Sequence, residues 1–301
     1  MWNSDSFDLD AYLTKISYEG DRAPTLETLR ALHRGHVLHL RWSTVDAMLH
    51  HDVPLDLETL GAKLVTGGRA GYCFEHATLF AAALEALGYD FFAVQGRVVM
   101  GETDRILPTS HAMLVVELDG RRQLCDVGFG ASQLEPIEMI RGEAGNEVRQ
   151  DSWRYWLREG EVSPGAHGWA LHQPAAGTGT ATARTATGTG TGTAADGSGW
   201  MVRHTFTETP QYPIDFRVSN YFVASNPHSP FSRRLYVQRV LPDRLHVLDE
   251  LTLTTSSPDP DVPTGTRVLE PAEVPRVLAE LFDIRQSAEE ATLLTQTLAA
   301  R

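Results

Sequence analysis

The sequence has little cysteine and no long apolar run. Only 2 of its 301 residues are cysteines, too few for a disulfide framework, so we expect reduced thiols and a cytoplasmic location. No apolar stretch approaches the roughly 18 residues of a membrane span, and the N-terminal stretch lacks the basic segment and apolar core of a signal peptide. The net charge of −13 repels phosphate backbones. We therefore expect neither membranes nor nucleic acids as partners.

Helical patterns dominate the first ninety residues, and strand patterns follow them. Asp8, Thr25 and Asp56 each precede a helical pattern and are suited as N-caps. From Tyr89 onward the segments are short and rich in β-branched and aromatic residues, as in strands; they include NYFVAS (220–225). Two helical patterns close the chain. Helices and strands that are segregated along the chain favour an α+β fold.

Residues 175–199 form a low-complexity insert of glycine, threonine and alanine. The insert has no large apolar side chain whose burial could offset the entropy cost of ordering it. Strand-like segments, GWALHQ and WMVRHTF, flank it. We interpret the insert as an enlarged hairpin loop, since long loops cost little free energy.

Cys73 lies between a glycine-rich turn and a helical pattern. A buried structural cysteine is the common alternative. At the first turn of a helix, however, the free N–H groups and the helix dipole stabilise an anion. The same features favour a thiolate nucleophile, which would need a base and a group that orients the base.

A predicted hairpin supplies candidates for both groups. Asp119–Gly120 is a strong two-residue turn signal. Strands folded about this turn place His111 and Asp126 on one face and Cys125 with Leu114 on the other. Separately, His111 could be a half-exposed strand residue and Asp126 a strand-end residue bonded to backbone. Together with a cysteine at a helix start, they favour a Cys–His–Asp triad.

Several motifs in this order resemble those of the arylamine N-acetyltransferases. RAGYCFEHA is similar to the active-site motif of that family, and the other motifs follow it in family order. The resemblance spans nearly the whole chain except the insert. The motifs are RAGYCFEHA (69–77), GRV (96–98), SHAML (110–114), DVGFG (126–130) and NPHSPF (226–231).

The resemblance implies an α+β fold with a papain-like cysteine core. It implies a helical bundle at 1–90 that carries the nucleophile. A β-barrel at 91–208 would carry the histidine and the aspartate and contain the insert 175–199. An α/β lid would occupy 209–301.

The resemblance also implies the chemistry. Cys73 would take an acetyl group from acetyl-CoA and pass it to an arylamine or hydrazine in a ping-pong cycle, with His111 as base and Asp126 as its partner; acetyl-CoA would be a co-substrate and no metal would be needed. The implied substrate-binding residues are Trp42, Tyr72 and Phe129, and the implied CoA-binding residues are Ser110, Gly128, Gly130 and Ser229.

The chain departs from the family pattern near the acceptor site. LRWSTVD (40–46) stands where members have Ile-Pro-Phe-Glu-Asn-Leu-Asp, so Trp42 replaces a phenylalanine of the acceptor pocket. Ala70, Ala77 and Ala112 replace a glycine, an asparagine and a methionine. Two alternatives therefore stay open: an amide synthase that releases or macrolactamises a polyketide chain, and a cysteine hydrolase.

Histidines also recur at positions 33, 36 and 39, with two more at 50–51. A zinc site needs about four converging ligands, and no cysteine pair accompanies these histidines. We interpret them as solvated or capping residues.

Overall fold

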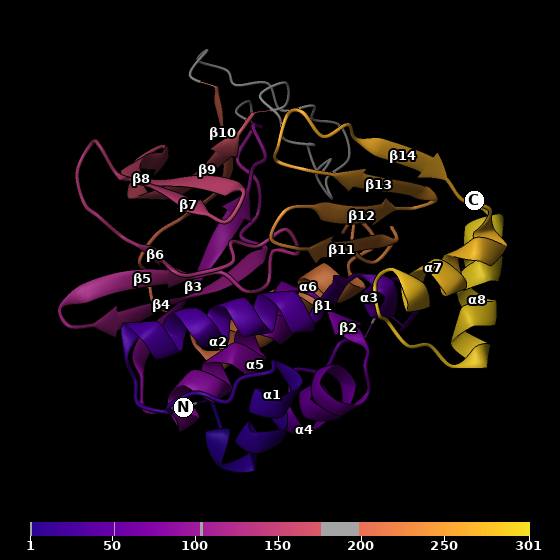
Figure 1. Cartoon of the computed structure of the whole chain (residues 1–301), viewed down its shortest axis with the longest axis horizontal. Helices are drawn as coiled ribbons and strands as arrows, with labels where there is room; N and C mark the ends of the chain where they lie inside the picture. The colour runs from indigo at the N-terminus through magenta and orange to yellow at the C-terminus, as the bar shows by residue number, and fades with distance from the viewer. Residues whose placement is uncertain (1, 51, 103–104, 176–198) are drawn as a thin grey trace.

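The chain folds into two sheets and a group of helices (Figure 1). This computed structural model describes residues 2–50, 52–102, 105–175 and 199–301. An eight-stranded sheet curls into a nearly closed barrel, and a six-stranded sheet lies beside it. The N-terminal helices gather below both sheets in Figure 1. No helix in the described ranges is long and apolar enough to cross a membrane.

The three predicted N-caps are confirmed. The side chains of Asp8, Thr25 and Asp56 each accept a hydrogen bond from a backbone N–H of the helix that follows. The N-terminal elements are the 3-10 turn η1 (Ser4–Ser6), α1 (Leu9–Lys15), α2 (Leu26–His39), α3 (Val45–His50), α4 (Leu57–Leu60), the π-helical turn η2 (Gly61–Thr66) and α5 (Cys73–Ala86).

Helix α5 is the central helix of the core. Every residue from Cys73 to Leu84 is buried, as expected of a helix with apolar side chains on every side, and the polar Glu75 and His76 are buried with them. Such a helix is held by packing along its whole length, so its first residue has a well-defined position.

The barrel contains the predicted hairpin in the predicted register. Leu114 pairs with Cys125 and Leu118 with Arg121. Asp119 and Gly120 have φ values of 50° and 73°, as a type I′ turn requires. The strands are β3 (Asp90–Val98), β4 (His111–Leu118), β5 (Arg121–Cys125), β6 (Ile137–Glu138), β7 (Asn146–Gln150), β8 (Trp153–Ser163), β9 (Ala166–Pro174) and β10 (Trp200–Phe206), in the order β6-β5-β4-β3-β10-β9-β8-β7.

The strands that flank the insert pair with each other. β9 and β10 are antiparallel, with Trp200 opposite Pro174, and the N–H of Ala175 donates to the carbonyl of Gly199 at 2.9 Å. The hairpin interpretation of the flanks is therefore confirmed, while residues 176–198 of the insert lie outside the described residues.

The six-stranded sheet joins the two ends of the chain. Its order is β14-β13-β12-β11-β1-β2. The two short strands from the first ninety residues, β1 and β2, pair with each other, and β1 also pairs with the C-terminal strand β11. Its strands are β1 (Arg41–Ser43), β2 (Ala70–Gly71), β11 (Tyr236–Val240), β12 (Leu245–Asp249), β13 (Thr252–Ser256) and β14 (Gly265–Val268). The division at residues 90 and 208 stays a prediction.

The predicted strand at 220–225 is wrong. These residues are the second half of α6 (Pro213–Ser225), which begins with a proline at its first turn, a position that favours helix initiation. The remaining elements are the 3-10 turn η3 (Pro271–Glu273), α7 (Val274–Glu280) and α8 (Ala288–Ala299).

Candidate active site

Cys73 is the first residue of α5, and a buried network holds the turn before it. The N–H of Tyr72 donates to Oε2 of Glu75 at 3.0 Å, and the Glu75 carboxylate pairs with Nζ of Lys63 at 2.6 Å. The thiol donates to the carbonyl of Ser110 at 3.6 Å. Gly128 approaches so closely that a Cβ there would lie 2.7 Å from the Cα of Cys73, so this position requires glycine.

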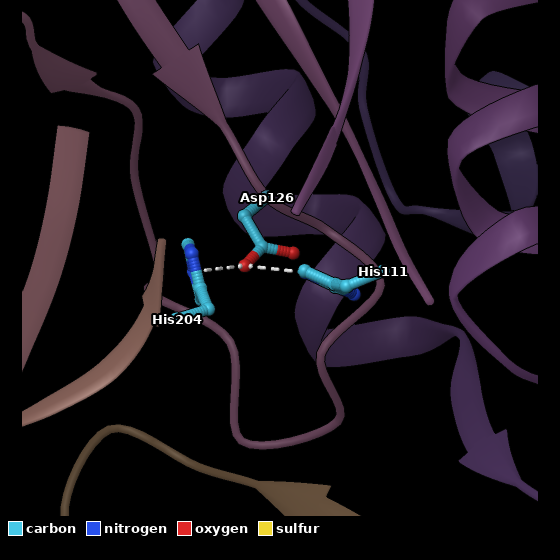
Figure 2. A group of neighbouring side chains, drawn as sticks. All are labelled: His111, Asp126 and His204. Atoms are coloured by element: carbon cyan, nitrogen blue, oxygen red, sulfur yellow. Dashed lines mark hydrogen bonds and ion pairs between the residues drawn. The ribbon is translucent and has the colours of Figure 1, made fainter. Parts of the chain in front are cut away.

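His111 and Asp126 meet as the hairpin geometry predicts. Nε2 of His111 lies 3.0 Å from Oδ2 of Asp126, and both side chains are buried (Figure 2). The His111 N–H does not point straight at the oxygen, so the contact is an ion pair rather than an aligned hydrogen bond. Ser110, which accepts from Cys73, directly precedes His111. The structure thus brings the three predicted residues together.

The electrostatics of this pair favour a charged histidine. Burial lowers the pKa of His111. The Asp126 carboxylate and an interaction with Cys73 raise that pKa by more than burial lowers it, to about 9. Burial raises the pKa of Asp126, but its contact with the charged His111 and the hydrogen bond from His204 hold that pKa far below its ordinary value. At neutral pH the proton therefore stays on His111 and Asp126 is ionised.

His204 on β10 is a further member that sequence reasoning missed. Its Nε2 lies 3.1 Å from the same Oδ2 of Asp126 (Figure 2). Burial lowers the pKa of His204 to about 4, although Asp126 acts in the opposite direction. No turn signal pairs β10 with β5 in the sequence, so only the three-dimensional fold reveals the contact.

These three side chains also have the composition of a metal site. Ligand atoms of His111, Asp126 and His204 lie within 4.8 Å of one another. In this structure, however, both imidazoles already lie within contact distance of one carboxylate oxygen. A metal would have to displace those contacts.

The three predicted substrate residues make different contacts in and near the site. The ring of Phe129 packs against the rings of His111 and His204, with centroid distances of 5.1 and 5.6 Å. Trp42 is buried, and its Nε1 donates to the carbonyl of Gly128 at 2.7 Å. The hydroxyl of Tyr72 donates to the side chain of Asn220 on α6.

Two of the predicted CoA residues line one cavity. Ser110 and Ser229 lie on a cavity of about 810 Å³ with Arg105, Arg233 and Phe231. Gly128 and Gly130 lie elsewhere. Gly128 packs on Cys73, and a Cβ at Gly130 would lie 2.1 Å from Oε1 of Gln238.

The interpretation of His33 and His36 as solvated or capping residues is wrong. Both are fully buried beside Phe80. His36 accepts from the Tyr12 hydroxyl at Nδ1, and its Nε2 lies 2.9 Å from Nδ1 of His76. The leucine spacing predicted helix α2 correctly. The sequence pattern did not predict the burial of these histidines, because histidine counts as a polar residue even on the inner face of a helix. His51 lies outside the described residues.

Comparisons with known proteins identify the family. A family model described as N-acetyltransferase matches residues 25–291. The arylamine N-acetyltransferase of Mycolicibacterium smegmatis is 34% identical over 244 residues, which are 79% of this chain and 78% of that protein. The chain therefore belongs to the arylamine N-acetyltransferase family.

Solved structures agree with this assignment. The structure of the arylamine N-acetyltransferase from Mycobacterium abscessus is 48% identical in sequence, with a TM-score of 0.89, over 100% of this chain and 98% of that chain. The Mycobacterium marinum arylamine N-acetyltransferase in complex with CoA is 26% identical, with a TM-score of 0.80, over 97% of this chain and 98% of that chain. The barrel and the sheet beside it are thus features of this family.

Proposed function

We propose that the protein transfers an acetyl group from acetyl-CoA to an arylamine or hydrazine nitrogen through an acetyl-Cys73 intermediate. The observation that carries the proposal is the meeting of three residues from three elements: Cys73 at the start of α5, His111 at the start of β4 and Asp126 after β5. A nucleophile at a helix start beside a strand histidine is also the arrangement of a papain-like core. The reduced thiol that it needs agrees with action in the cytoplasm.

In the first half-reaction, the Cys73 sulfur attacks the carbonyl carbon of the thioester. The C–S bond to CoA breaks, and CoA leaves as a thiol after it takes the proton that His111 carries. The raised pKa of His111, about 9, keeps that proton available at neutral pH. Asp126 holds the imidazolium and stabilises its charge.

In the second half-reaction, the amine nitrogen attacks the acetyl carbon on Cys73. His111, now neutral, takes a proton from the amine, and the C–S bond to Cys73 breaks. The amide leaves, and His111 keeps the proton that it took from the amine, as an imidazolium beside the regenerated Cys73 thiolate. Phe129 offers an apolar surface for the aromatic acceptor, because its ring lies directly against His111.

The cavity at Ser110 and Ser229 suits the CoA moiety. Ser110, whose carbonyl accepts from Cys73, lies on its wall, and Arg105 and Arg233 on the same wall could pair with phosphate groups. Residues from 209–301 form one wall of this cavity, which agrees with the predicted role of that segment as a lid.

The direct test is intact-protein mass spectrometry after incubation with acetyl-CoA alone. We expect one added acetyl group on the native protein and none on Cys73→Ser. Addition of an arylamine should then remove the acetyl group and yield the acetylated amine. Continuous CoA release without amine would instead identify a hydrolase, and an unmodified Cys73 would contradict the acyl-enzyme.

A further inference from the structure

Asp126 has two histidine neighbours on the same carboxylate oxygen, and they are bound differently. His204 makes a hydrogen bond to Oδ2 at 3.1 Å, whereas the N–H of His111 lies off the line to that oxygen. The hydrogen bond that the described residues give to the other oxygen, Oδ1, is a long one, from the N–H of Gly128 at 3.3 Å. His204 therefore provides the best-aligned side-chain donor to Asp126 among the described residues.

The tautomer of His204 follows from its partner. A carboxylate oxygen only accepts, so Nε2 of His204 must carry the hydrogen. The pKa of about 4 keeps the ring neutral at neutral pH, and Nδ1 is then a bare acceptor that has no partner in the described structure. The titratable and charged groups around the ring are Asp126, His111 and Arg203. His204 thus acts on Asp126 as a neutral dipole and leaves the single positive charge at the carboxylate to His111.

A bulge in β10 directs His204 into the site. The pairing of β10 with β9 shifts between Val202 and His204, which leaves Arg203 as the extra residue. In a regular strand the side chains of neighbouring residues point to opposite faces. Here Arg203 and His204 are both buried and both contact Phe129. A bulge that redirects a side chain beside an active site is a recurrent device in sheets.

We propose that His204 is a positioning residue for the transfer reaction, which holds Asp126 in the orientation that serves His111. This inference rests on the proposed function through Asp126. Without His204, the described contacts that remain at Asp126 are the long bond from Gly128 and the poorly aligned ion pair with His111, so the carboxylate is held less firmly in that orientation.

Three substitutions separate the hydrogen bond from the ring. His204→Phe keeps a flat ring and removes the donor. His204→Asn keeps an amide that is too short to reach Oδ2, and His204→Gln places an amide nitrogen near the original Nε2. His246→Phe is the control, since His246 is also a buried histidine with a hydrogen bond, to Thr255 at 2.8 Å, but lies in the other sheet.

The readouts are the rate of Cys73 alkylation by iodoacetamide at pH 7 and steady-state acetyl transfer. We expect His204→Phe and His204→Asn to slow alkylation about tenfold or more. The kcat should fall by a similar factor with little change in KM for the amine. His204→Gln should recover most of the native rate, and His246→Phe should match the native protein.

The outcomes divide cleanly. Native rates in His204→Phe would overturn the proposal, and so would a Gln variant as slow as the Phe variant, because the hydrogen bond would then be irrelevant. Melting temperatures identify any variant that fails to fold, and the remaining variants then decide. Alkylation needs neither acetyl-CoA nor amine. It therefore still tests His204 if the native protein proves unable to acetylate arylamines.

Discussion

Two groups of buried histidines meet helix α5, and only one of them contains a charged imidazole. One group is His111 and His204 around Asp126, next to Cys73 at the start of the helix. The other is His36 and His76, with His33 nearby, joined to Tyr12 in the helical part of the molecule. All five imidazoles are nearly excluded from solvent. Burial alone therefore cannot explain why only one of them has a raised pKa.

The hydrogen-bond directions explain the neutral group. Nε2 of His76 lies 3.1 and 3.2 Å from the carbonyls of Arg41 and Gly71, so it must donate. Nδ1 of His76 then accepts from His36, and His36 accepts from Tyr12. Each hydrogen bond in this row of side chains thus has a donor and an acceptor while both imidazoles are neutral. Burial lowers the pKa of His33 and of His76 to about 4, and that of His36 well below its ordinary value.

The difference is one carboxylate. Asp126 raises the pKa of His111 to about 9, although His111 is nearly as deeply buried as His76. His204 shares the same carboxylate yet stays neutral, because burial lowers its pKa more than Asp126 raises it, and the nearby His111 charge lowers it further. A single buried aspartate thus distinguishes His111, which carries a proton at neutral pH, from the three histidines of the neutral group.

The largest expected effect follows from removal of that carboxylate. In Asp126→Asn, His111 should behave like His76, with an imidazole pKa below 6.5 in an NMR titration. Acetyl transfer should fall about a thousandfold or more, as expected when the orienting carboxylate of a triad is lost. Asp243→Asn, on the exposed surface, is the control. A His111 that stays protonated in the Asn variant would show that Asp126 is not the cause.

The two cysteines extend the comparison to thiols: Cys73 at the start of α5 contacts His111 on one face of the β4–β5 hairpin, and Cys125 lies on the other face. Cys73 has His111 as a neighbour, whereas Cys125 is packed in the core, where burial raises its pKa. A small excess of iodoacetamide at pH 6 should modify Cys73 about a hundredfold faster, with activity lost in step. Peptide mapping by mass spectrometry gives the ratio, with Cys73→Ser as the control. Preferential labelling of Cys125 would contradict both the triad and the hairpin register.

The neutral group should make the protein sensitive to acid. The folded pKa of His33 lies below the unfolded value of about 6.5, so the unfolded state binds more protons below that pH and stability falls there. Replacement of one such histidine, in His33→Phe, should reduce the slope of unfolding free energy by about 1.4 kcal/mol per pH unit between pH 6 and 5. Urea unfolding at a series of pH values measures the slope.

The control for this slope is His167→Gln, because the side chain of His167 is 69% exposed, and we expect it to leave the slope unchanged. His111 affects the pH dependence of stability in the opposite direction. Its folded pKa is raised, so its contribution is complete below about pH 6.5 and is lost as pH rises through about 9. A native slope in His33→Phe would mean that His33 is protonated in the folded state.

The sequence predicted the pair of His111 and Asp126, but it did not predict that His33 and His36 are buried and neutral. The Asp119–Gly120 turn sets the register of β4 and β5, and this register alone brings His111 and Asp126 together. His204 could not be found in this way, because its direction depends on a bulge that has no sequence marker. The strand expected at 220–225 failed because short aromatic runs suit helix and strand alike.

The smallest expected effect concerns Trp42, whose proposed place in the acceptor pocket stays a prediction. Its Nε1 donates to the carbonyl of Gly128, and Gly128 packs on Cys73. Trp42→Phe removes this bond, which contributes about 1 kcal/mol in typical cases. We expect a loss of several-fold in kcat/KM for every acceptor, because the loop beside the nucleophile is less firmly held.

Trp153→Phe is a matched control, since Trp153 is also buried and its Nε1 donates to the carbonyl of Leu241 at 2.8 Å, outside the site. Both variants should lose similar stability in thermal unfolding, but only Trp42→Phe should lose activity. An effect confined to bulky or to small amines would instead show that the indole lines the acceptor pocket. The hydrogen bond acts on all acceptors equally, whereas a pocket wall distinguishes them by size, so a panel of anilines and hydrazines separates the two roles.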